Sequence, residues 1–223
     1  MVRKSRIPIA PKHAFEPVNS SDPCYPEVLV DYFCQQFLID DRQVMQVYEE
    51  LLALAFWVRG FGPHNVMEVG TAGATFFVLS RLATGKKVAI DIRDMRPKIH
   101  PFMFGHEWCF FQGDSQAAEM QQNVRAYCDS FDLIFIDADH RYVGVKRDFA
   151  NYRELLSDRG VIVFHDVDPD HAFKGGAGGE VWRFWNELDE GSKTTLCCTR
   201  SSGRVQFLGK DSHFGGIGIW RPI

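Results

Sequence analysis

Short apolar runs recur along the middle of the chain, and each closes on a glycine or a carboxylate, as in residues 66–70, 88–91 and 131–137. Runs of this length, separated by segments long enough for a helix, are typical of buried parallel strands in an α/β sheet. The pattern predicts strands over residues 65–69, 87–91, 108–112, 131–137 and 160–165. Ligands bind at the carboxyl edge of such sheets, so the residues that close these strands are candidate site residues.

Helix-spaced apolar residues fill the segments between the predicted strands. They predict helices over residues 40–60, 73–83, 115–128, 141–156 and 180–189. The first should begin at Asp40 or Asp41 and end at Gly60, with Glu49 and Glu50 on an exposed face. Two strands are expected to close the chain, over residues 194–199 and 215–220, with residues 204–208 as a further strand or hairpin arm.

The first 39 residues differ from the rest of the chain. They hold half of the ten prolines, which predicts an irregular arm or cap over residues 1–39 and one domain over residues 40–223. Together with the aromatic helix 180–189, whose Trp182, Phe184 and Trp185 suit a core or a subunit contact, this arm makes a homodimer plausible.

The composition of the chain argues against several classes of binding partner. A formal net charge of −4 gives no general attraction to nucleic acid, because only residues 3–6 are locally basic. The six cysteines include no Cys-x-x-Cys pair, so a disulfide framework is not expected. Neither a membrane span of about 20 apolar residues nor a signal-peptide core is visible. We therefore expect a cytoplasmic protein with no nucleic-acid or membrane partner.

Three strand ends carry candidate ligand groups. Gly70 and Gly73 allow a sharp strand-to-helix turn that a ligand can approach, although glycines serve many such turns for steric reasons alone. Asp91 ends the next strand, where a carboxylate can accept both hydroxyls of a ribose. Asp114 and Ser115 follow the third strand and could bind an adenine amino group, cap the next helix, or do both.

In this order the residues resemble the class I S-adenosylmethionine-dependent methyltransferases. The loop 68–74 is similar to their first motif, Asp91 to their ribose-binding acid, and Asp114 with Ser115 to their adenine-side motif. The resemblance implies a Rossmann-like three-layer sandwich: a seven-stranded, mostly parallel sheet with an antiparallel C-terminal strand. It also implies that S-adenosylmethionine binds at Glu68, Gly70, Thr71, Gly73, Asp91, Asp114 and Ser115.

Residues 135–148 and 160–166 are similar, more narrowly, to small-molecule O-methyltransferases of the catechol and macrolide-sugar type and to the cephalosporin-hydroxylase-like group. In metal-dependent relatives, an Asp after the fourth strand and an adjacent pair after the fifth bind magnesium. Asp137 matches the first ligand and His165 with Asp166 the pair, while His140 matches the general base. His165 departs from the usual oxygen donor, so manganese, zinc or iron competes with magnesium as the expected metal.

The chemistry explains the residue types. An acceptor hydroxyl is a poor nucleophile until it is positioned and its proton is removed or shared, and a divalent metal assists both. The acceptor is expected to be a small molecule with a sugar, polyketide or catechol-like hydroxyl. Its specificity should come from residues 1–39, 93–107 and 167–180. There, His171 and the glycines of 175–179 form either a lid or a flexible connection.

Other readings stay open. Asp137 and Asp139 could be helix-start carboxylates, and His140 could cap the helix near Arg141. The enzyme could work without metal, using His140 or His165 as base, or the chain could be a non-catalytic subunit of the same fold. An NAD-dependent oxidoreductase is disfavoured by the glycine spacing, and a nucleic-acid methyltransferase by the lack of a basic surface.

Overall fold

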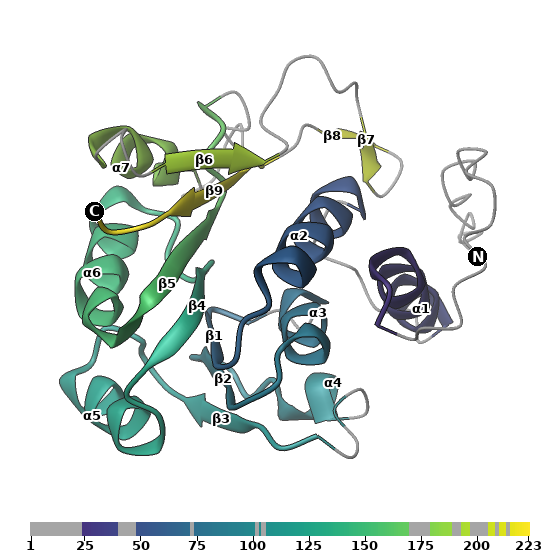
Figure 1. Cartoon of the computed structure of the whole chain (residues 1–223). Coiled ribbons are helices and arrows are strands. Elements are labelled where there is room, and N and C mark those ends of the chain that lie inside the picture. The colour runs from purple at the N-terminus through teal and green to yellow at the C-terminus, as the bar shows by residue number, and fades with distance from the viewer. Residues whose placement is uncertain are drawn as a thin grey trace, which may run out of the picture.

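Seven strands form one mixed sheet in the computed structural model of the chain (Figure 1). The structure describes residues 24–39, 48–71, 74–100, 103, 106–169, 179–188, 193–196, 205–207, 210–212 and 215–223. The sheet has the order β3-β2-β1-β4-β5-β9-β6. Its strands are β1 (Val66–Val69), β2 (Lys87–Asp91), β3 (Cys109–Gln112), β4 (Phe131–Ile136), β5 (Leu156–His165), β6 (Lys193–Leu196) and β9 (Ile217–Trp220).

Strand β9 alone runs against its neighbours in this sheet, because it pairs antiparallel with both β5 and β6 while the other pairs are parallel. This confirms the predicted Rossmann-like fold class with an inserted antiparallel C-terminal strand. The chain order reverses between the neighbouring strands β1 and β4. In open α/β sheets, such a reversal opens a crevice at the carboxyl edge.

Helices cover both faces of the sheet. On one side lie α1 to α4 and on the other α5 to α7 (Figure 1). Their bounds are α1 (Pro26–Ile39), α2 (Tyr48–Phe61), α3 (Ala74–Leu82), α4 (Arg96–Ile99), α5 (Ala118–Tyr127), α6 (Tyr142–Tyr152) and α7 (Val181–Glu187), with a 3-10 turn over Arg153–Leu155. Among the helices that the structure describes, none combines the length and apolarity needed to cross a membrane.

Strand β4 shows how the apolar runs divide between the two faces. Ile134 and Ile136 pack with α5, α6 and α7, whereas Leu133 and Phe135 pack with α2 and α3. Successive side chains of a strand point to opposite faces, so a continuous apolar run is what a sheet covered on both sides requires. The expected core role of Phe184 and Trp185 is met in the first of these clusters.

The prediction of an irregular N-terminal arm is wrong for the helix α1. It begins at Pro26, and proline is tolerated in the first turn, where the missing N–H has no helical partner. Leu29 and Val30 are buried against Leu51 of α2 and Phe77 of α3, and this tertiary packing stabilises the helix. Residues 1–23 and the expected N-caps Asp40 and Asp41 lie outside the described residues.

Several helices and strands begin or end at other residues than the sequence predicted. Strand β5 begins at Leu156 rather than at residue 160, because Leu156 pairs with Phe131 across a register shift that the local pattern does not show. Helix α6 therefore ends at Tyr152. The loop 93–107 contains the short helix α4, held by the buried Ile99. The expected hairpin arm 204–208 is strand β7 (Val205–Phe207), which pairs with β8 (Lys210–Ser212).

Candidate active site

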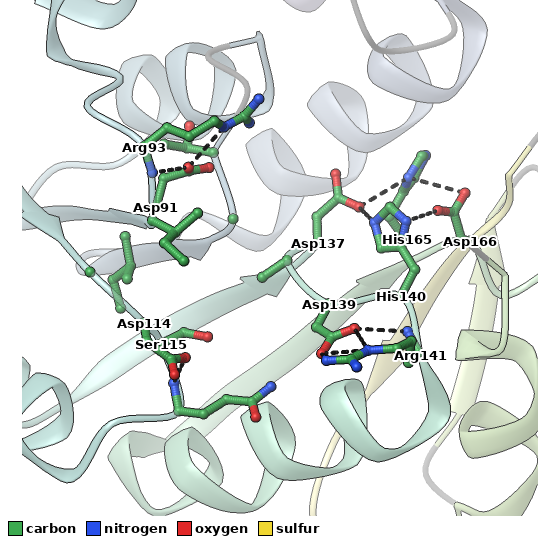
Figure 2. A pocket seen from close by; sticks show the side chains of 17 residues that line it. Asp91, Arg93, Asp114, Ser115, Asp137, Asp139, His140, Arg141, His165 and Asp166 are labelled. Atoms are coloured by element: carbon green, nitrogen blue, oxygen red, sulfur yellow. Dashed lines mark hydrogen bonds and ion pairs between the residues drawn. The ribbon is translucent and has the colours of Figure 1, made fainter. Parts of the chain in front are cut away.

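A pocket of about 600 Å³ opens at the carboxyl edge of the sheet, on both sides of the reversal between β1 and β4. Acids from the β2 and β3 ends lie at one end of it, and a cluster of carboxylates and imidazoles from the β4 and β5 ends lies at the other (Figure 2). The lining residues are Gly70, Thr71, Ile90, Asp91, Ile92, Arg93, Gly113, Asp114, Ser115, Gln116, Asp137, Ala138, Asp139, His140, Arg141, His165 and Asp166.

The turn after β1 depends on Gly70. Its φ is +85°, and a Cβ there would lie 2.4 Å from Cα of Ala138 and 2.6 Å from the carbonyl oxygen of Asp137. The Gly70 N–H also donates to the carbonyl of Ile90 (2.8 Å). Only glycine lets the turn after β1 rest directly on the turn after β4, which brings the two halves of the pocket together. Gly73, the other predicted turn glycine, lies outside the described residues.

Glu68 lies beneath this turn instead of lining the pocket. Its carboxyl is 1% exposed and accepts a hydrogen bond from Oγ1 of Thr71 (3.1 Å). Burial, reinforced by the nearby charge of Asp137, raises the pKa of Glu68 well above its ordinary value. Glu68 thus supports Thr71 and does not line the pocket. The structure therefore does not support the prediction that Glu68 contacts the cofactor directly.

Asp91 ends β2 at the pocket wall. One of its oxygens, Oδ1, accepts the backbone N–H of Arg93 (2.8 Å) and the Nε–H of the same residue (3.2 Å). The apolar side chain between them, Ile92, is 71% exposed and also lines the pocket. Ile92 was not predicted as a site residue, and Arg93 was predicted only as part of the specificity segment 93–107. Their position directly after an acid that ends a strand was the available signal.

Asp114 and Ser115 take separate roles. Asp114 is exposed to the pocket, and its Oδ1 accepts the N–H of Gln116 (2.9 Å). It does not cap α5, since that helix begins later, at Ala118. Ser115 is buried, and its Oγ donates to Oδ1 of Asp148 (2.7 Å). The interpretation of Asp114 and Ser115 as the N-cap of α5 is therefore wrong. The contact of Asp114 with the adenine amino group stays a prediction.

Asp148 of α6 anchors this part of the wall. It is 0% exposed, and burial raises its pKa to about 6, against the hydrogen bond from Ser115. A carboxyl whose pKa is raised on folding contributes most to stability below its unfolded pKa and loses that contribution as the pH rises through the folded pKa. The contribution of Asp148 to the free energy of unfolding should therefore fall between about pH 4 and pH 7.

We expect the Asp148→Asn variant to lack this dependence. From the shift of the pKa from 3.8 to about 6, the stability of the variant relative to wild type should increase by about 1.5 kcal/mol between pH 5 and pH 8. Urea unfolding at the two pH values measures it. Asp129→Asn, at an exposed position, is the control for the loss of one carboxylate. A pH-independent effect of Asp148→Asn would contradict the assignment.

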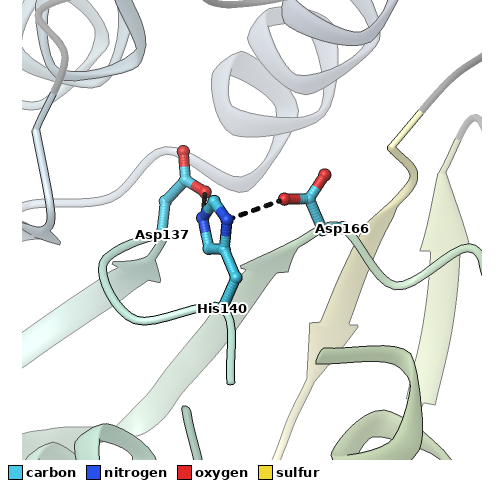
Figure 3. A group of neighbouring side chains, drawn as sticks. All are labelled: Asp137, His140 and Asp166. Atoms are coloured by element: carbon cyan, nitrogen blue, oxygen red, sulfur yellow. Dashed lines mark hydrogen bonds and ion pairs between the residues drawn. The ribbon is translucent and has the colours of Figure 1, made fainter. Parts of the chain in front are cut away.

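Two carboxylates enclose His140 at the other end of the pocket (Figure 3). Nε2 of His140 lies 3.1 Å from Oδ1 of Asp137, and its Nδ1 lies 3.5 Å from Oδ2 of Asp166. His165 joins the same group, because its Nδ1 lies 3.4 Å from Oδ1 of Asp137 and 3.3 Å from Oδ1 of Asp166. All four predicted residues converge.

Charge holds this cluster together. The hydrogen bond to Asp137 raises the pKa of His140 to about 9, although burial opposes it. Burial would also lower the pKa of His165, but Asp137 and Asp166 outweigh it and raise that pKa. Conversely, burial would raise the pKa of Asp137, but the charge of His165 and the hydrogen bond from His140 lower it. The carboxylates and imidazoles of the cluster thus stabilise one another's charged forms.

Backbone geometry aims Asp166 into the cluster. It has φ +60°, a conformation that non-glycine residues adopt at a cost of about 1–3 kcal/mol and mostly at functional sites. Gly215, just before β9, passes so close that a Cβ there would lie 2.4 Å from Oδ1 of Asp166. The strand end and the glycine form a narrow cradle around the carboxylate.

The donor set suits a divalent cation. Asp137, His140 and Asp166 each offer a ligand atom, and these atoms lie within 4.8 Å of one another. Nδ1 of His165 is close to the same carboxylates. Two carboxylates and two imidazoles fit manganese, iron, cobalt or zinc better than magnesium, which prefers oxygen. The structure thus adds His140, the predicted base, to the candidate ligands.

One buried acid of the site was predicted to be exposed. Glu50 of α2 is 0% exposed; its Oε2 lies 3.4 Å from Nε2 of His165, and its Oε1 accepts the N–H of Gly216 (2.6 Å). The prediction of an exposed Glu50 is wrong, because α2 packs toward the ends of β5 and β9. The apolar residues that nearly encircle this helix were the signal that it is buried on more than one side.

Comparison with known proteins agrees with this geometry. Residues 67–167 match a family model described as a methyltransferase domain, and this segment runs from β1 to just beyond β5. A 60-residue segment is 42% identical to an uncharacterized protein, y4gI, of Sinorhizobium fredii. That segment covers 26% of this chain and 6% of the relative, so the chain spans only a small part of that protein.

Solved structures share the fold. An O-methyltransferase from Bacillus cereus in complex with SAH is 18% identical, with a TM-score of 0.60 over 91% of this chain and 92% of that one. The O-methyltransferase TomG from Streptomyces achromogenes, in complex with SAM, is 19% identical, with a TM-score of 0.58 over 90% of this chain and 89% of that one. These likenesses confirm the fold that the strand-end residues predicted.

Proposed function

Because residues 67–167 match a methyltransferase domain, we propose that this protein transfers a methyl group from S-adenosylmethionine to a hydroxyl oxygen of a small molecule. A single observation carries the proposal: one pocket joins the acids of the β2 and β3 ends to the carboxylate–imidazole cluster of the β4 and β5 ends. A cofactor and an acceptor can therefore meet within it.

The first end of the pocket would hold the cofactor. The turn at Gly70 and Thr71 brings main-chain groups to the pocket wall. Asp91 has one oxygen engaged by Arg93 and would accept the ribose hydroxyls, while Ile92 offers an exposed apolar surface to the adenine ring. Asp114 would accept the adenine amino group. These roles follow from the chemistry of each group and its place in the pocket.

The cluster at the other end would receive the acceptor. His140 is about one-third exposed and stands between Asp137 and Asp166, where it can take the proton of an approaching hydroxyl once it is itself neutral. A divalent cation, when bound, lowers the pKa of the hydroxyl and offsets the carboxylate charge that holds the His140 proton. Asp137 and Asp166 would hold that cation, with His165 as a nitrogen donor.

A metal-free methyltransferase is the second candidate. The hydrogen bond between His140 and Asp137 (3.1 Å) favours it, since a carboxylate can orient a histidine base without any cation. Methyl transfer in the presence of a strong chelator separates the two mechanisms: full activity supports the metal-free route, and loss that added manganese or cobalt restores supports the metal. In both mechanisms the proposed acceptor is a sugar, polyketide or catechol-like hydroxyl. The predicted homodimer is a separate proposal, which size-exclusion chromatography would test.

Cofactor binding tests the proposal directly. Wild-type protein should bind S-adenosylhomocysteine in calorimetric titration, and Asp91→Asn should weaken this binding about 10- to 100-fold, because hydrogen bonds to a charged group contribute about 1.5–3 kcal/mol. Asp94→Asn is the matched control, since Asp94 pairs with Arg96 (2.8 Å) at the surface and does not line the pocket. The absence of binding by the wild type would refute the proposal.

A further inference from the structure

Glu50 is a buried acid with two engaged oxygens, and it comes from a helix outside the segment that matches the methyltransferase family. Oε1 accepts the N–H of Gly216 (2.6 Å), and Oε2 faces Nε2 of His165 (3.4 Å). A fully buried carboxylate needs a partner for each oxygen. The Gly216 N–H is the partner of Oε1, and the His165 ring is the neighbour that can serve as the partner of Oε2.

The two nitrogens of His165 face different groups. While Nε2 points to Glu50, Nδ1 lies 3.4 Å from Asp137 and 3.3 Å from Asp166. The ring is 9% exposed, and a Cβ on Gly215 would lie 3.2 Å from its Cε1 and Nε2. The imidazole is therefore fixed between α2 and the start of β9, with one edge turned to the carboxylates.

We propose that Glu50 is a positioning residue that makes His165 a nitrogen ligand of a divalent transition-metal ion, an inference that rests on the metal site of the proposed function. By accepting the Nε2–H, Glu50 would leave Nδ1 as the nitrogen that faces Asp137 and Asp166 and binds the ion in place of a proton. A metal-binding histidine generally donates its other N–H to such an acceptor, which fixes both the tautomer and the ring orientation.

The arrangement also predicts which ion is affected. Magnesium binds oxygen donors and can use Asp137 and Asp166 without the imidazole, whereas cobalt, manganese, iron and zinc accept nitrogen readily. The oxygens of Glu50 face Gly216 and the His165 ring, so its effect on a bound ion would pass through that ring. Its removal should therefore weaken the binding of transition-metal ions selectively.

Glu50→Gln is the sharpest variant. Its amide oxygen can still accept the Gly216 N–H, so the fold contact remains. The amide NH₂ then meets Nε2 of His165, which must accept, so the neutral ring carries its proton on Nδ1, where it faces the carboxylates and opposes metal binding. In titrations of the 223-residue chain, we expect the Kd for Co²⁺ to rise about 10- to 100-fold and that for Mg²⁺ to change less than about 3-fold.

Glu119→Gln is the control, because it removes an exposed carboxylate of α5 that does not line the pocket and should leave the Co²⁺ affinity unchanged. Nitrogen NMR of the wild-type protein loaded with Zn²⁺ is a second measurement that needs no variant, and it should show the His165 proton on Nε2. An unchanged Co²⁺ affinity in Glu50→Gln, equal losses for Co²⁺ and Mg²⁺, no Co²⁺ binding by the wild type, or a proton on Nδ1 would each overturn the inference.

The outcome separates this inference from the proposed function. S-adenosylhomocysteine affinity is measured on the same samples and should be equal in wild type and Glu50→Gln, because Glu50 does not line the pocket. Normal cofactor binding with unchanged Co²⁺ affinity would reject the role of Glu50 alone. Failure of the wild type to bind the cofactor would reject the methyltransferase proposal whatever the Co²⁺ result.

Discussion

Replacing Asp137 by asparagine is expected to lower the rate of methyl transfer by about 10³-fold or more. Asp137 contacts both His140 (3.1 Å) and His165 (3.4 Å), so the neutral amide removes the charge that would orient the base and bind the cation in the proposed mechanism. General acid–base catalysis alone contributes about 10²–10⁴-fold, and loss of a metal ligand adds to this. Release of S-adenosylhomocysteine over a panel of sugar, polyketide and catechol-type acceptors provides the measurement.

The control for this variant is Asp158→Asn. Asp158 lies on β5, the strand that ends in His165, but it is exposed and does not line the pocket. It should retain the wild-type rate. Asp137→Asn should still bind S-adenosylhomocysteine, because the acids that would hold the cofactor are at the other end of the pocket. A wild-type rate in Asp137→Asn would show that the cluster takes no part in the reaction.

Gly70→Ala should cause the largest loss of stability. The added methyl group would lie 2.4 Å from the Cα of Ala138, and the φ of +85° disfavours any L side chain. The conformation costs about 1–2 kcal/mol and the overlap about 1–3 kcal/mol more, so unfolding by urea should show a loss of about 2–5 kcal/mol. Since the turn would also shift at the pocket wall, the affinity for S-adenosylhomocysteine should fall at least about 10-fold.

Gly62→Ala separates the two contributions. Gly62 has φ +63°, but a Cβ there would meet no atom within 4 Å. This variant should therefore lose only the conformational part, about 1–2 kcal/mol, and keep its cofactor affinity. Equal losses in the two variants would mean that the contact between the turns after β1 and β4 is not what makes glycine necessary at position 70.

The sequence was sufficient to locate the five parallel strands β1 to β5 and the edge of the sheet at which they end. Apolar runs such as 131–136 specify buried strands through local composition, and parallel strands bring their carboxyl ends to one edge whatever the loops do. For that reason the sequence alone predicts that Asp91, Asp114, Asp137 and Asp166 share one edge of the sheet, and in the structure all four line one pocket.

Only the tertiary structure decided the features that depend on distant partners. Helix α1 is stabilised by packing on α2 and α3, and β5 begins at Leu156 because it pairs with Phe131. Glu50 lies 115 residues from His165 in the chain, and the contact between them exists only once α2 packs beside β5. Local periodicity reports which face of an element is apolar, but it carries no information about which residue of another element will meet that face.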